Sequence, residues 1–146
     1  MKSTIRRVHK FFQLLPDERA VLVQACGHFL LIELALRILP FTRLLSLSKK
    51  VFLKRRGKPV LPLILAVPRL AWLVEVAGRY TPVTATCLKK ALVLSWLLAR
   101  RGIQTEVRIG VARPDGGLEA HAWLDYHGEV ILGHQEHERY EPLLRA

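Results

Sequence analysis

The spacing of apolar residues changes once along this chain, near residue 81. Before that point the apolar residues are too dense for strand alternation, and the runs are too long for single strands. Proline residues delimit the first run, with Pro16 at its start and Pro40 at its end. We predict helices over residues 16–39, 43–53 and 67–80. The first half of the chain is therefore predicted to be helical.

The second half combines one helix with alternating strands. Thr84 or Thr86 is suited to be the N-cap of a helix over residues 87–101, and Gly102 follows as its stop signal. Val, Ile and Ala then alternate with polar residues, and glycine-containing turns interrupt the alternation. We predict strands at residues 105–112, 118–126 and 129–132. The expected fold class is α+β, a helix followed by an antiparallel three-stranded meander, behind an N-terminal helical region.

These patterns indicate one compact unit of 146 residues with two parts. Residues 1–80 form the helical region, which includes a basic loop at residues 49–58, and residues 81–146 form the core with the strands. The apolar fraction is 51%, but charged residues such as Glu33 and Arg37 interrupt the apolar runs. We therefore expect a soluble chain without a transmembrane span, which could lie near a membrane surface. Glu33 and Arg37 are also spaced to pair on one helix.

The chain carries 23 Lys and Arg against 12 Asp and Glu, a net charge of +11, which favours an acidic partner or surface. The densest basic segment, residues 49–58, contains no zinc-finger spacing or RNA-recognition signature, so we expect no nucleic-acid partner. A solvated loop and an anion-binding face both stay open for it. No secretion signal is recognisable, so Cys26 and Cys87 are expected to be free thiols in the cytoplasm, with Cys26 an inert core residue.

Two residues of the second half have the order of a cysteine nucleophile and its base. Cys87 stands at the predicted helix start, where exposed backbone N–H groups and the helix dipole favour a thiolate. His121 lies on a strand further along, where an imidazole can take up and return a proton. Spacing alone leaves the alternative of a small core cysteine and a structural histidine. Trp123 is expected to be a core residue or to shield His121 from water.

The second half resembles a known family in three stretches. They read "RYTPVTATCLKKALVLSWLLARRGIQTEVRIGVA", "AHAWLDYHGEVILG" and "RYEPL". These motifs are similar to the transglutaminase-like cysteine peptidases that remove the leader in lasso peptide biosynthesis, specifically the stand-alone peptidase half. The helical segment "LLPDERAVLVQACGHFLLIELALRILPF" is similar to the one that precedes the catalytic core in that family. The resemblance implies a papain-like or transglutaminase-like core, with Cys87 as nucleophile and His121 as general base and acid.

The third catalytic residue does not follow the family's pattern. In that pattern an Asp lies about a dozen residues after the His, and here Gly133 and His134 stand there. Asp125 has the right chemistry, but four strand residues at roughly 3.3 Å each separate it from His121 by about 13 Å. It is the first candidate, and a dyad oriented by a backbone carbonyl stays open beside it. The further candidates are Glu129 and Glu136.

A two-residue turn at His127 and Gly128 would fix the pairing of the last two predicted strands. It pairs Tyr126 with Glu129. By the same count, Ala122 and His121 lie opposite Gly133 and His134.

The resemblance also implies the substrate and the partners. The substrate would be a lasso peptide precursor, cut between leader and core, and the partners a separate leader-recognition protein and a lasso cyclase. We expect no cofactor. We also expect no metal site, because the spacing of His121, His127, His134 and His137 matches no closed zinc site. The alternatives are an acyl transferase of the transglutaminase type and a non-catalytic basic binding module.

Overall fold

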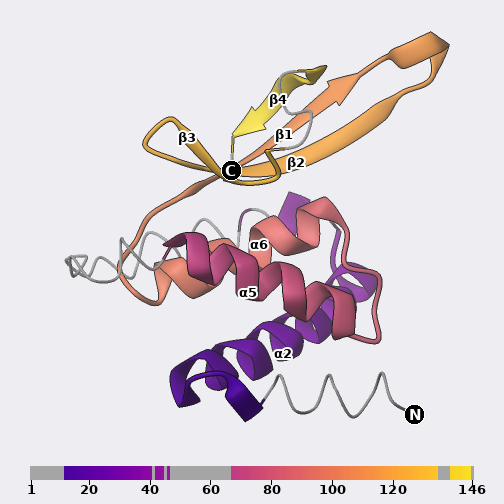
Figure 1. Cartoon of the computed structure of the whole chain (residues 1–146). Coiled ribbons are helices and arrows are strands. Elements are labelled where there is room, and N and C mark those ends of the chain that lie inside the picture. Colours follow the sequence, from indigo (N-terminus) through magenta and orange to yellow (C-terminus); the bar gives the residue numbers. More distant parts are fainter. Residues whose placement is uncertain (1–11, 41, 45, 47–66, 135–138, 146) are drawn as a thin grey trace.

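The computed structural model describes residues 12–40, 42–44, 46, 67–134 and 139–145 of the chain. Three helices and four strands position the site. In chain order they are α2 (Pro16–Ile38), α5 (Val67–Tyr80), α6 (Cys87–Ala99), β1 (Glu106–Ala112), β2 (Glu119–Tyr126), β3 (Glu129–Leu132) and β4 (Glu141–Arg145), with a short 3-10 turn, η1 (Pro114–Gly116), between β1 and β2. The sheet lies on one side of α5 and α6, and α2 lies on the other side of these two helices (Figure 1). Helices in the first part of the chain, followed by an antiparallel sheet, confirm the predicted α+β fold class.

Helix α2 begins and ends where its sequence signals predict. Pro16 opens the helix, and the backbone N–H of Leu15 donates to the Glu18 carboxylate at 3.2 Å. The helix ends at Ile38, two residues before Pro40. The predicted pair between Glu33 and Arg37 is present at 3.2 Å. Of the predicted helix over residues 43–53, residues 43, 44 and 46 are helical, and the others lie outside the described residues.

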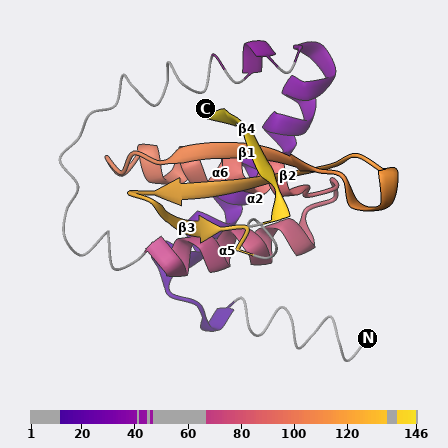
Figure 2. The ribbon, with the colours of Figure 1, turned by 90° about the horizontal axis from the view of Figure 1, so that it is seen from above.

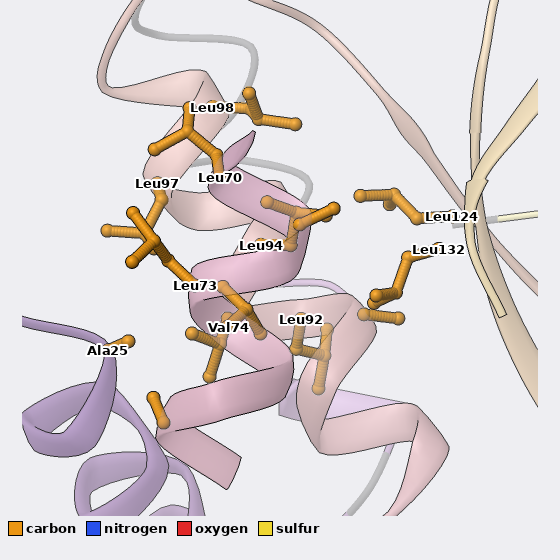
Figure 3. Close-up of a cluster of buried hydrophobic side chains, with 14 of the residues drawn as sticks. Ala25, Leu70, Leu73, Val74, Leu92, Leu94, Leu97, Leu98, Leu124 and Leu132 are labelled. Carbon is orange, nitrogen blue, oxygen red and sulfur yellow. The ribbon is translucent and has the colours of Figure 1, made fainter. Parts of the chain in front are cut away.

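Helix α6 is the central helix, packed between the other two helices and the sheet (Figure 2). Nine of its 13 residues are buried, so its sequence is apolar nearly all round. Leu94, Leu97 and Leu98 are fully buried and belong to one core cluster with Leu73 and Val74 of α5. On the other side, Leu124 of β2 and Leu132 of β3 point from the sheet toward the helices (Figure 3). A single core therefore joins the helical region to the sheet.

The sheet has the order β3-β2-β1-β4. The antiparallel meander of β1, β2 and β3 agrees with the sequence prediction, whereas β4 is a fourth strand that we did not predict. It pairs with β1, and the register shifts between Ile109 and Gly110, where Gly110 faces Pro142. An edge strand tolerates a proline because one side of its backbone needs no partner. The short "EPLLR" segment has no strand alternation, which explains why the sequence did not reveal it.

The pairing of β2 with β3 differs from the register predicted above. Tyr126 pairs with Glu129 as expected, and His127 and Gly128 form the turn with positive φ angles. A β-bulge then pairs Leu124 with Leu132, one residue beyond the regular position. The bulge brings Gly133 against Trp123, because a Cβ on Gly133 would lie 3.0 Å from Trp123 Cβ. The prediction that Ala122 lies opposite Gly133 was therefore wrong by one residue.

Among the described residues, α2 is the one helix long and apolar enough to cross a membrane, with a mean hydropathy of 1.7 over its best window. One face of α2 is buried against the protein, including Ala25, Phe29 and Ile32. The other face is exposed and carries Val23, Leu30, Leu31, Leu34 and Ile38. The buried face is that of a core helix.

Candidate active site

Cys87 is the first residue of α6 and is half-buried. Thr86 is the N-cap, and its hydroxyl accepts the backbone N–H of Lys89 at 3.4 Å. The first hydrogen bond of the helix backbone joins the Lys90 N–H to the Thr86 carbonyl at 3.0 Å. The N–H groups of Cys87 and Leu88 precede this bond, so the helix itself provides no acceptor for them. A thiol and two backbone donors thus meet at the positive end of a helix.

The segment before Cys87 is held against α5 by close packing. A Cβ on Gly78 would lie 3.0 Å from the Cβ of Ala85 and 3.4 Å from Lys90 Cε. Gly78 therefore permits an approach that a larger residue would hinder. These contacts place Gly78 of α5 against the segment that leads into α6.

His121 lies on β2, and its ring makes three described contacts. Nε2 is 3.2 Å from the carbonyl oxygen of Gly133, which is a hydrogen bond when Nε2 carries the proton. The ring stacks on Trp123 at 6.2 Å between centroids and tilts against Tyr140 at 5.1 Å. A proton held on Nε2 leaves Nδ1 as the basic nitrogen. The imidazole is thus oriented by a backbone carbonyl and two aromatic rings.

The Gly133 carbonyl stands at the position where the family's pattern has an Asp, twelve residues after the His. Gly133 has φ of 84°, a conformation that residues with a side chain rarely adopt. This geometry matches the carbonyl-oriented dyad that the sequence left open. The bulge between β2 and β3 brings the carbonyl within reach, and no local sequence pattern signalled it.

Asp125 is buried, and its carboxylate contacts residues other than His121. Oδ1 accepts the Gly128 N–H of the β2–β3 turn at 2.9 Å, and Oδ2 lies 3.5 Å from an Arg108 guanidinium nitrogen. No described contact joins it to His121. These contacts give Asp125 a structural role in the turn. Glu129 is exposed at the start of β3, and Glu136 lies outside the described residues.

Cys87 and His121 come from elements that pack together, α6 and β2. The hydrogen bonds of the described residues, however, do not join the thiol to the imidazole. Pairing between β1 and β2 is regular, so side chains of β2 alternate between its two faces. Leu124 points to the helices (Figure 3), so by alternation His121 and Trp123 belong to the opposite face. Within residues 12–40, 42–44, 46, 67–134 and 139–145, no group of three or more His, Cys, Asp or Glu residues could hold a metal ion.

A model of the transglutaminase-like superfamily matches residues 28–145. The chain belongs to the transglutaminase-like superfamily. Neither the curated proteins nor the solved structures gave a significant match. Membership of this superfamily is compatible with cysteine-peptidase or acyltransferase chemistry, and it agrees with the helix-then-sheet order that carries Cys87 and His121.

Proposed function

We propose that this transglutaminase-like protein is a cysteine peptidase that removes the leader from a lasso peptide precursor. The observation that carries the chemistry is the start of α6, where the half-buried Cys87 is the first residue after the Thr86 cap. The resemblance of the motifs around Cys87 and His121 supports the substrate. Glutamine-directed or other acyl transfer is the second candidate, which the superfamily match favours equally.

In the proposed reaction, His121 Nδ1 takes the proton of the Cys87 thiol, and the resulting thiolate attacks the carbonyl carbon between leader and core. The N–H groups of Cys87 and Leu88 hold the resulting oxyanion. His121 gives its proton to the departing amine, and the carbon–nitrogen bond breaks to leave the leader as a thioester on Cys87. His121 then takes a proton from water, which hydrolyses the thioester. The products are a leader carboxylate, a core peptide with a new amino terminus and the regenerated thiol.

The proposal requires Cys87 and His121 to meet when substrate is bound. Because His121 belongs to the face of β2 opposite the helices, this meeting requires the backbone around His121 or the start of α6 to change position, and not only an existing contact to tighten. The Nε2 contact with Gly133 supports this role for His121, because it leaves Nδ1 to act as the base. A pH profile of kcat/KM that loses its acidic limb in His121→Ala would agree with this assignment.

A cleavage assay with the precursor peptide tests the proposal directly. The wild-type protein should release a free leader and core, and Cys87→Ala should release neither. In ¹⁸O-labelled water the label should enter the new leader carboxylate. Unlabelled leader joined to an added amine would instead identify an acyl transferase. Cleavage that survives in Cys87→Ala would refute both.

We further propose that a separate leader-recognition protein delivers the precursor, and that a lasso cyclase takes the core. A disordered leader loses conformational entropy on binding, so contacts around one scissile bond bind it weakly. A partner that holds the leader and docks here raises the local concentration of the scissile bond. The exposed apolar face of α2, with Val23, Leu30 and Leu34, is the surface we assign to this docking. Cleavage that proceeds equally well without the recognition protein would contradict the proposal.

A further inference from the structure

Lys89 is a buried cation in the first turn of α6, and this end of a helix disfavours positive charge. It is the third residue of α6, and its side chain is only 10% exposed. The first turn of a helix carries the positive end of the dipole, and burial of an ammonium group costs free energy. Local sequence and burial both oppose a lysine here. Its position therefore depends on contacts from elsewhere in the fold.

The Lys89 ammonium joins three segments of the protein. Nζ donates to the Glu33 carboxylate of α2 and, at 2.8 Å, to the carbonyl oxygen of Thr84. Its hydrogen bond is the main cause that holds the pKa of Glu33 below its usual value. The same Glu33 also accepts from Arg37, so the carboxylate is held from two sides. Lys89 thus connects α2, the segment before α6 and α6 itself.

The Thr84 carbonyl lies at the point where the chain turns into the catalytic helix. It accepts the Thr86 N–H at 3.2 Å as well as the Lys89 ammonium. Thr86 is the N-cap, and Cys87 follows it directly. A shift of Thr84 would therefore move both the cap and the backbone N–H groups beside the thiol.

We propose that Lys89, held by Glu33, is a positioning residue for Cys87. This inference rests on the proposed function, in which Cys87 is the nucleophile. Lys89 acts through the Thr84 carbonyl and does not itself touch the reacting atoms. By fixing the entry to α6 it sets the direction of the Cys87 side chain and of the N–H donors around it. Small displacements of such groups reduce rate more than binding.

Lys90 provides a matched control on the same helical turn. Its Nζ pairs with Glu75 of α5 at 2.7 Å, and its side chain is 26% exposed. The Lys90 side chain therefore makes an ion pair between helices and has no described hydrogen bond to the segment that leads into Cys87. The backbone N–H of Lys90, which bonds the Thr86 carbonyl, is retained in any substitution of the side chain. Replacing each lysine with methionine removes the charge and keeps most of the side-chain length.

The experiment measures precursor cleavage and the rate at which iodoacetamide alkylates Cys87 as a function of pH. Each variant is made in a Cys26→Ala background, so that Cys87 is the thiol that reacts. Lys89→Met should lower kcat about tenfold or more with KM changed less than about threefold, and should slow alkylation near pH 7. Lys89→Arg should restore part of both rates, and Lys90→Met should stay within about threefold of the parent.

Equal effects of Lys89→Met and Lys90→Met on kcat and alkylation would overturn the positioning role, because a structural loss moves both alike. If circular dichroism shows that Lys89→Met is unfolded, kcat and the alkylation rate are measured in Glu33→Gln instead. A lowered kcat and slower alkylation in Glu33→Gln support the inference, and unchanged rates overturn it. A parent protein that cleaves no precursor would refute the proposed function, and the alkylation rates would still test the effect of Lys89 on the thiol.

Discussion

Gly133 offers a direct test of whether a backbone carbonyl orients the catalytic imidazole. Gly133→Ala places a side chain on a residue with φ of 84°, which costs about 1–2 kcal/mol. The new Cβ would also lie 3.0 Å from Trp123 Cβ and 3.1 Å from the Ala122 carbonyl oxygen. Such overpacking adds about 1–3 kcal/mol. We therefore expect a total destabilisation of about 2–5 kcal/mol.

Gly128 is a natural control for the conformational part of this cost. Its φ is 87°, and a Cβ there would meet nothing within 4 Å. Gly128→Ala should therefore destabilise by only about 1–2 kcal/mol. For a chain of this size each kcal/mol lowers Tm by about 2–4 °C, so thermal unfolding separates the two variants.

Of the two variants, only Gly133→Ala should lower the rate of cleavage. Relief of the close contacts moves its carbonyl away from His121 Nε2, and a hydrogen bond of this kind contributes about 0.5–1.5 kcal/mol. Its loss predicts a decrease of kcat by about two- to tenfold, measured by precursor cleavage at a temperature where both variants are folded. Gly128→Ala should keep the parental kcat. If the two variants have the same kcat, the Gly133 carbonyl does not orient the catalytic base.

The remaining predictions concern the thiols, the carboxylate of the turn and the basic segment. Burial raises the pKa of the Cys26 thiol, so iodoacetamide should modify Cys26 slowly at neutral pH and faster as the pH rises, and Cys26→Ala should keep cleavage within about threefold. Iodoacetamide should abolish cleavage through Cys87, whereas EDTA should have no effect; the opposite result would indicate a metal enzyme. Asp125→Asn should lower Tm through its contacts with the turn but retain most of kcat, and a loss as complete as that of Cys87→Ala would restore Asp125 as the third catalytic residue. Neutralising the lysines and arginines of residues 49–58 should raise KM more than it lowers kcat, and a change in kcat alone would exclude a role in recruitment.

The helices and the first three strands could be predicted because their signals are local. Pro16, a threonine cap before Cys87 and the turn at His127 and Gly128 act on a few neighbouring residues. The structure has Pro16 and the turn where the sequence indicated them, and of the two threonines that the sequence left open, Thr86 is the cap. The order of a cysteine at a helix start and a histidine on a later strand is also a property of the sequence. The resemblance of these motifs was enough to predict the transglutaminase-like class, which the superfamily match supports.

Tertiary structure decided what surrounds these residues. Strand β4 is held by pairing with a strand about thirty residues earlier, and its own sequence has no alternation. The bulge that shifts Leu132 opposite Leu124 makes the Gly133 carbonyl the partner of His121 and leaves Asp125 to the turn. The pairing of β4 and the position of the bulge are not signalled by any local sequence pattern, although the contact of Asp125 with Gly128 spans only three residues.

The same distinction applies to Lys89. By sequence alone it is an unfavourable cation in the first turn of a helix. Glu33, 56 residues earlier, supplies the carboxylate that makes its burial tolerable, and the Thr84 carbonyl gives it a place beside the nucleophile. The sequence determined that a thiol stands at a helix start and an imidazole on a later strand, because the caps and turns that delimit these elements depend on neighbouring residues. Only the packed fold determined which groups hold them in place, because hydrogen bonds and ion pairs form between atoms that are close in space, whatever their separation along the chain.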